Sequence, residues 1–116
     1  IRAIARDLGA ELGVGGHLNV LRRTRVAGFT LENAIGVDQL KGGNFSTLPL
    51  AEVARTTFSV RELDFEEVNE LSFGRPLSPN QSSGIFAALS PDNRLIALLE
   101  NAADKAKPLA VFAAAN

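Results

Sequence analysis

The sequence predicts an α+β fold, in which helices flank a mixed or antiparallel sheet and a compact second lobe follows from about residue 58. Three observations predict this class. Apolar residues recur at helical spacing in the first twelve positions. Residues 17–29 alternate loosely and include β-branched side chains, and three short apolar runs near the end are separated by turn residues.

The composition is that of a folded protein and excludes several classes. Of the 116 residues, 46% are hydrophobic and 22% are charged, which is the usual balance of a globular domain. No cysteine is present, which excludes a disulfide scaffold and any thiolate metal site or nucleophile. No apolar run approaches the roughly 18–20 residues of a membrane span. Because the sequence opens with Ile1 inside an expected helix and not with methionine, we expect a piece of a longer protein.

Basic side chains gather near the start. Residues 1–29 hold five arginines and two acidic residues, whereas the remainder holds seven basic and eleven acidic residues. The formal net charge of -1 hides this asymmetry. It indicates that only the first segment contacts a polyanion.

The first half is predicted to begin with a short amphipathic helix that ends in a glycine-rich turn at residues 13–16. Its apolar stripe consists of Ile1, Ile4, Ala5, Leu8 and Leu12. Residues 17–29 favour a strand. Thr30 resembles the cap of a further helix, which Gly36 interrupts. Residues 41–44 are predicted to form a loop, and Pro49 is predicted to open a brief helical turn.

The second half is predicted to contain a helix and a small antiparallel sheet. Residues 58–63 can form a strand, and Asp64 then caps a helix that Gly74 ends. Residues 78–84 form a polar loop. Residues 85–89, 95–99 and 109–112 are predicted strands, and a turn at residues 91–94 joins the first two.

Three candidate sites have ordinary structural explanations. Residues 13–16 (GVGG) invite comparison with a phosphate loop, but neither nucleotide-loop spacing is met, so a helix end and turn is expected. His17 has no partners at metal-ligand spacing; it either contacts an RNA phosphate or ties down a loop, and we favour the loop. Asp64, Glu66 and Glu67 lie at a helix start, where the helix dipole favours negative charge, so a solvated face explains them.

Arg22, Arg23 and Arg25 are the strongest candidates for a binding function. Three guanidinium groups within four positions repel one another unless anions pair with them, and few acidic residues lie nearby. Phosphate is a natural bidentate acceptor, so nucleic-acid contact and a salt-bridged surface strand both remain open. A strand would place Leu21, Arg23 and Arg25 on one face and Arg22 on the other. We therefore expect at least one arginine to have an internal role.

The chain resembles the bacterial TruB-type tRNA pseudouridine synthases. Residues 1–9 (IRAIARDLG), 12–18 (LGVGGHL) and 21–26 (LRRTRV) match that family in order, spacing and identity. Residues 72–77 (SFGRPL) resemble, more loosely, the PUA-type lobe that ends these enzymes. The resemblance divides the chain into residues 1–57, the C-terminal portion of the catalytic domain, and residues 58–116, a PUA-like domain with a small β pseudo-barrel.

The resemblance also implies an activity and a set of site residues. The family isomerises the T-loop uridine of tRNA to pseudouridine, without cofactor or metal, after the nucleotide is flipped out. Arg2 stands where the family's arginine pairs with the catalytic aspartate, which lies outside this sequence, so the chain alone is expected to be inactive. Leu21 matches the apolar residue beside the target base. Arg22, Arg23, Arg25 and His17 are the RNA-binding candidates.

We expect a cytoplasmic monomer that binds the T arm of tRNA. We do not expect it to associate with a membrane. The alternative is a non-enzymatic RNA-binding module, in which the arginine-rich segment and the terminal lobe hold RNA for another protein.

Overall fold

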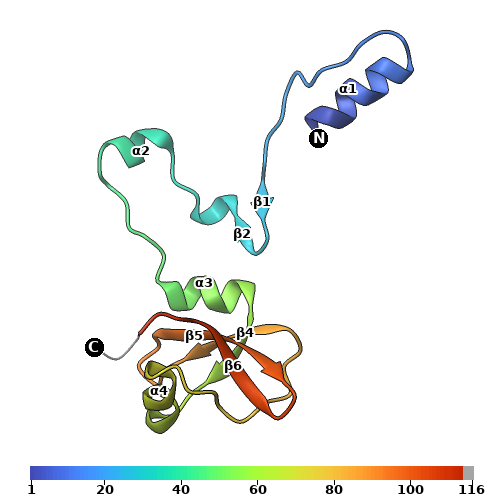
Figure 1. Cartoon of the computed structure of the whole chain (residues 1–116). Coiled ribbons are helices and arrows are strands. Elements are labelled where there is room, and N and C mark those ends of the chain that lie inside the picture. The colour runs from blue at the N-terminus through green and yellow to red at the C-terminus, as the bar shows by residue number, and fades with distance from the viewer. Residues whose placement is uncertain (114–116) are drawn as a thin grey trace.

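The computed structural model describes residues 1–113, which form two regions of different character (Figure 1). Residues 1–48, here called the arm, follow a drawn-out path through short elements. Residues 49–113, here called the lobe, form a layered domain. The molecule measures 63 × 42 × 24 Å. Every buried hydrophobic residue of the described part belongs to the lobe, so the core of this chain is the core of the lobe.

The arm contains short elements joined by extended chain. In order they are α1 (Arg2–Glu11), β1 (Arg25–Val26), β2 (Phe29–Thr30), the 3-10 helix η1 (Leu31–Asn33) and α2 (Val37–Lys41). The predicted first helix is confirmed as α1. The strand predicted over residues 17–29 is wrong for most of its length, because residues 17–24 have no strand partner and only β1 and β2 pair. The helix expected after Thr30 is two separate pieces, η1 and α2.

The end of α1 depends on close backbone contacts between glycines. The N–H groups of Val14 and Gly15 both donate to the carbonyl oxygen of Gly9, at 3.0 and 2.9 Å. A Cβ atom on Gly9 would collide with the backbone of Gly15, and one on Gly16 with the carbonyl oxygen of Ala5. The predicted helix end and turn are confirmed. Gly9 lowers helix propensity, but it lets the chain fold back against α1.

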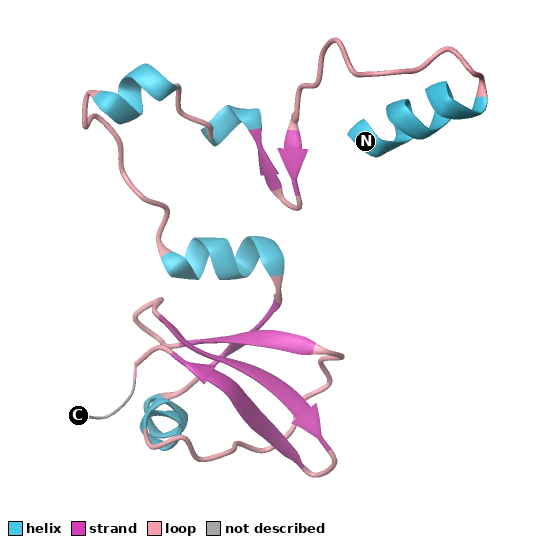
Figure 2. Cartoon of the chain, turned by 45° about the horizontal axis from the view of Figure 1, so that its top comes forward, coloured by secondary structure: helices cyan, strands magenta, loops and turns pink. Residues whose placement is uncertain are grey.

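The lobe has three layers, with a helix on each face of a sheet (Figure 2). The helices are α3 (Leu50–Thr57) and α4 (Phe65–Ser72). The strands, in sheet order, are β3 (Ser59–Glu62), β4 (Ile85–Leu89), β5 (Leu95–Ala102) and β6 (Lys105–Val111). β3 and β4 are parallel, so the chain must cross from one end of the sheet to the other, and α4 with residues 73–84 makes this connection. The other two pairs are antiparallel.

Alternate side chains of β4 contribute to two core clusters on opposite faces of the sheet. Phe86 packs with Leu71 in the cluster beneath α4, whereas Leu89 packs with Ala54 in the cluster beneath α3. All four of these side chains are buried. α3 is therefore packed on the sheet of the lobe.

The α+β class and the helix-flanked mixed sheet are confirmed, as are the strand after residue 58, the Asp64-capped helix and the strand at residues 85–89. β5 is longer than predicted, and β6 begins at Lys105 rather than at residue 109. The extension arises because Ala102 pairs with Lys105 across a tight hairpin. β3 and β6 are the edges of the sheet, so the expected pseudo-barrel does not close within residues 1–113.

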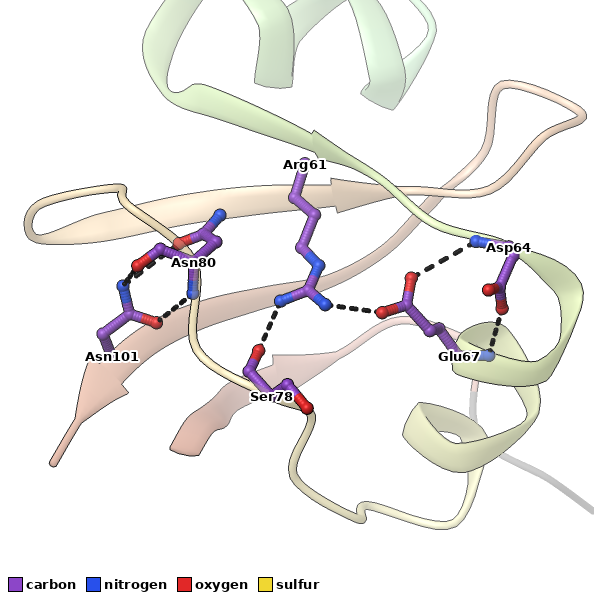
Figure 3. A network of polar contacts seen from close by, with 6 residues as sticks. All are labelled: Arg61, Asp64, Glu67, Ser78, Asn80 and Asn101. Atoms are coloured by element: carbon purple, nitrogen blue, oxygen red, sulfur yellow. Dashed lines mark hydrogen bonds and ion pairs between the residues drawn. The ribbon is translucent and has the colours of Figure 1, made fainter. Parts of the chain in front are cut away.

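Polar contacts fix the loop that joins α4 to β4 (Figure 3). Arg61 on β3 pairs with Glu67 on α4 and donates to the carbonyl oxygen of Ser78 at 2.6 Å. Asn101 on β5 donates to the carbonyl oxygen of Asn80 at 2.9 Å. The side chain of Arg61 is only 14% exposed, so water screens this ion pair less than a surface pair. It ties α4 and the loop to the sheet.

Candidate nucleic-acid interface

The arginine-rich segment of the arm ends in the β1–β2 hairpin. Arg25 pairs with Thr30 and Val26 with Phe29, which leaves Ala27 and Gly28 as a two-residue loop. Ala27 has a φ of 50°, in the left-handed region that tight hairpin loops use and that costs energy for a residue with a Cβ atom. The hairpin gives the extended run of residues 17–24 a fixed end.

Arg23 and Arg25 line one shallow hollow of about 220 Å³ on this hairpin. Its remaining lining residues are Thr24, Val26, Phe29, Thr30, Leu31 and Ala34. Arg22 does not line the hollow, whereas residues 23–26 all do, so the alternation predicted for these arginines stays a prediction. Two guanidinium groups beside an apolar floor can bind a phosphate while the floor contacts a sugar or a base.

Four arginines of the arm have no carboxylate partner within the part of the chain that the structure describes. The five ion pairs among residues 1–113 are Arg6–Asp7, Arg55–Glu62, Arg61–Glu67, Arg75–Glu70 and Arg94–Asp92. None of them involves Arg2, Arg22, Arg23 or Arg25. The donors of these four groups are thus not taken up by an acid of the described chain. An internal salt bridge for one of them stays a prediction.

The other predicted site residues lie apart from the hairpin hollow. His17 lines a second hollow, of about 250 Å³, against the apolar side of α1. Arg2, on the first turn of α1, and Leu21, in the extended run, are exposed and line neither hollow. The structure brings Arg23 and Arg25 together, but it does not bring Arg2, Leu21 or His17 to them. The roles assigned to these residues stay predictions.

The phosphate-loop explanation of residues 13–16 gains no support. The N–H groups of Val14 and Gly15 already donate to Gly9, so they are not free to bind phosphate. Over the described part of the chain, no three His, Cys, Asp or Glu side chains are grouped to hold a metal ion. None of its helices is long and apolar enough to cross a membrane.

Sequence reasoning missed a contact between the hairpin and the lobe. The tip of the hairpin at Gly28 lies against Thr56 of α3. A signal for the hairpin was present, because a two-residue pair ending in glycine between Val26 and Phe29 is typical of a hairpin loop. The strand expected over residues 17–29 runs through Ala27 and Gly28, and the hairpin corrects that expectation.

Two family models match most of the chain. The model described as "tRNA pseudouridylate synthase B C-terminal domain" matches residues 2–48, and the model described as "tRNA Pseudouridine synthase II, C terminal" matches residues 58–113. This chain belongs to the TruB family. The resemblance carried by the motifs in residues 1–26 and 72–77 is thereby confirmed.

Curated relatives named tRNA pseudouridine synthase B are similar over nearly the whole chain. The relative from Thermobifida fusca is 46% identical over 97% of this chain and 38% of its own length. Those from Mycobacteroides abscessus and Nocardia farcinica are 46% and 47% identical over 100% and 96% of this chain. The chain spans only 39% and 36% of these two TruB relatives. The division into two domains after residue 57 stays a prediction. α3 precedes that boundary in the sequence, but it packs on the sheet that follows it.

Proposed function

We propose that this chain forms part of a tRNA pseudouridine synthase, an isomerase that converts the T-loop uridine of tRNA to pseudouridine. The names of its TruB relatives support the activity. The observation that carries the proposal is the pairing pattern of the arginines. Arg2, Arg22, Arg23 and Arg25 have no carboxylate partner in the described chain, whereas every arginine of the lobe has one. The protein acts as a cytoplasmic monomer on the T arm of tRNA, without cofactor or metal.

The hairpin arginines bind the RNA backbone in this proposal. Arg23 and Arg25 hold phosphate at the hairpin hollow, and Arg22 contacts the backbone from the other side of the extended run. Leu21 precedes them and gives the flipped-out base an apolar surface that excludes water. His17 contacts RNA from the second hollow, beside α1.

In this proposal, Arg2 contributes to the catalytic step and not to tRNA binding. α1 exposes the apolar stripe of Ile1, Ile4, Leu8 and Leu12, and such a stripe is normally covered by a packing partner. Arg2 flanks this stripe, so a surface that covers the stripe also approaches the guanidinium. The chain spans 38% of the Thermobifida fusca relative, and we place the catalytic aspartate in the remainder. A guanidinium beside that carboxylate keeps it ionised and oriented for attack.

Salt dependence of tRNA binding by the complete enzyme tests the phosphate contacts. The variant R22A/R23A/R25A should bind tRNA more weakly, and the slope of log affinity against log salt should fall by about 2–3, since each phosphate contact contributes roughly 0.7–0.9. R94A is the matched control, because Arg94 is an exposed arginine of the lobe that pairs with Asp92. Its slope should equal that of the parent enzyme. An unchanged slope in the triple variant would show that these three arginines do not contact RNA phosphates.

Turnover is tested separately, by tritium release from tRNA labelled at uridine. Release by the parent enzyme supports the isomerase. Tight tRNA binding without any release would instead favour the non-enzymatic RNA-binding module.

A further inference from the structure

The tip of the arginine hairpin rests on the C-terminal end of α3. Figure 1 shows the β1–β2 turn reaching α3, although η1, α2 and the loop that follows separate the two in the sequence. A Cβ atom on Gly28 would overlap Cγ2 of Thr56 and would lie 3.1 Å from the carbonyl oxygen of Thr56. The hairpin loop therefore touches the lobe at a point where only a glycine fits.

The restriction at Gly28 comes from its contact with Thr56 and not from the backbone conformation of Gly28 itself. Gly28 does not have the positive φ that only glycine adopts readily, so its own conformation would accept alanine. Thr56 cannot turn its methyl group away freely, because its hydroxyl donates to the carbonyl oxygen of Glu52 at 2.9 Å. A β-branched side chain is also stiff about χ1. The methyl group of Thr56 is thus a fixed contact surface.

α3 in turn is held firmly to the lobe. Ala51 and Ala54 are buried against the sheet. Arg55 pairs with Glu62 on β3 at 2.8 Å and donates to the side-chain oxygen of Asn93, in the β4–β5 turn, at 3.0 Å. A displacement of the hairpin relative to Thr56 is therefore a displacement relative to the whole lobe.

We propose that Gly28 is a positioning residue, whose close contact with Thr56 sets where Arg22, Arg23 and Arg25 lie relative to the lobe. The inference rests on the proposed function, because it assigns a purpose to the place of these arginines. A larger residue at position 28 must push the hairpin, and the arginines with it, away from α3. tRNA that contacts both the hairpin and the lobe would then find the arginines displaced from its phosphates.

A rescue experiment in the complete enzyme tests this proposal. G28A should raise the KM for tRNA by about tenfold and leave kcat within about threefold, since coupling between residues in contact is of this size and the loss is one of binding. T56S removes Cγ2 but keeps the hydroxyl, so G28A/T56S should restore the KM to within about threefold of the parent value. T56V keeps a methyl group toward the hairpin, and G28A/T56V should not recover.

Two controls separate the inference from a folding defect and from the proposed function. The unfolding midpoint of the lobe in urea should be the same in all three variants, because none of the changes touches its core. A parent-like KM in G28A, or G28A/T56S and G28A/T56V with equal KM values, would overturn the positioning role. If the parent enzyme released no tritium, the proposed activity would fail, while the same rescue pattern in the dissociation constant for tRNA would still decide the role of Gly28.

Discussion

In the lobe, each arginine has a carboxylate partner, whereas in the arm only Arg6 has one among residues 1–113. Arg61 is the most enclosed of the paired groups and holds α4 and the α4–β4 loop in place (Figure 3). Arg23 and Arg25, by contrast, lie beside an open hollow with their donors available. The lobe uses guanidinium groups to complete its own fold, whereas the arm presents them outward. The difference indicates which arginines of the described chain have donors available to an external anion, as the proposed RNA contact requires.

Apolar side chains differ between the two regions in the same way. Phe86 and Leu71 of the lobe are fully buried, whereas Ile4 and Leu8 of α1 are 67% and 59% exposed. A helix with one apolar stripe gains most of its stability from packing, and α1 has no packing partner in residues 1–113 apart from the glycine turn. The apolar stripe of α1 is therefore typical of a helix that packs on another surface, and the lobe does not supply that surface.

The largest expected effect on stability separates the two regions directly. Leu71→Ala should lower the free energy of unfolding of the lobe by about 3–5 kcal/mol, because it leaves a cavity at a fully buried position. Leu8→Ala should cost less than about 0.5 kcal/mol in this chain but about 2 kcal/mol in the complete enzyme, where we expect the stripe to be covered. Urea unfolding followed by circular dichroism measures both. Equal small costs of Leu8→Ala in the two contexts would show that nothing packs on α1.

The next effect concerns catalysis, and α1 offers a matched pair of arginines. Arg2→Ala should lower kcat by on the order of 100-fold, as does removal of a group that stabilises charge in an active site, while tRNA affinity changes by less than about threefold. Arg6 lies on the same helix, but it pairs with Asp7 at 2.7 Å and lies farther from the apolar stripe. The kcat of Arg6→Ala should therefore be close to that of the parent enzyme.

The pH profile distinguishes a counter-ion from a structural role for Arg2. Without the guanidinium, the pKa of the catalytic carboxyl rises, so the rate of the Arg2→Ala variant should recover partly as pH increases. Tritium release measured across pH checks this. A normal rate in that variant, or equal losses for Arg2→Ala and Arg6→Ala, would refute the assigned role.

Features set by local chemistry could be predicted from the sequence, and those set by distant partners could not. Asp64 and Gly74 bound α4 as expected, because capping and a left-handed C-terminal glycine act within one helical turn. The alternation of residues 17–24 predicted a strand, but a strand also needs a neighbour, and no segment of residues 1–113 pairs with it. The parallel pairing of β3 with β4 depends likewise on where α4 returns the chain.

The candidate site divides along the same line. The clustering of Arg22, Arg23 and Arg25 was visible in the sequence, whereas the availability of their donors depends on where the acidic residues of the folded chain lie. The contact of Gly28 with Thr56 joins two regions that the sequence analysis assigned to separate elements, and no periodicity could reveal it.

The smallest expected effect compares two helix caps, one in each region. In the lobe, the Asp64 carboxylate accepts from the N–H of Glu67 at 2.8 Å, and the Glu67 carboxylate accepts from the N–H of Asp64 at 3.3 Å. In the arm, the Thr30 hydroxyl oxygen accepts from Glu32 at 3.4 Å and precedes a helix of only three residues. Asp64→Ala should therefore lower the free energy of unfolding by about 1 kcal/mol. Thr30→Ala should change it by less than about 0.3 kcal/mol, because the long bond orders little packed structure. Urea midpoints of the two variants in this chain measure the difference, and an equal loss from both would mean that the arm unfolds together with the lobe.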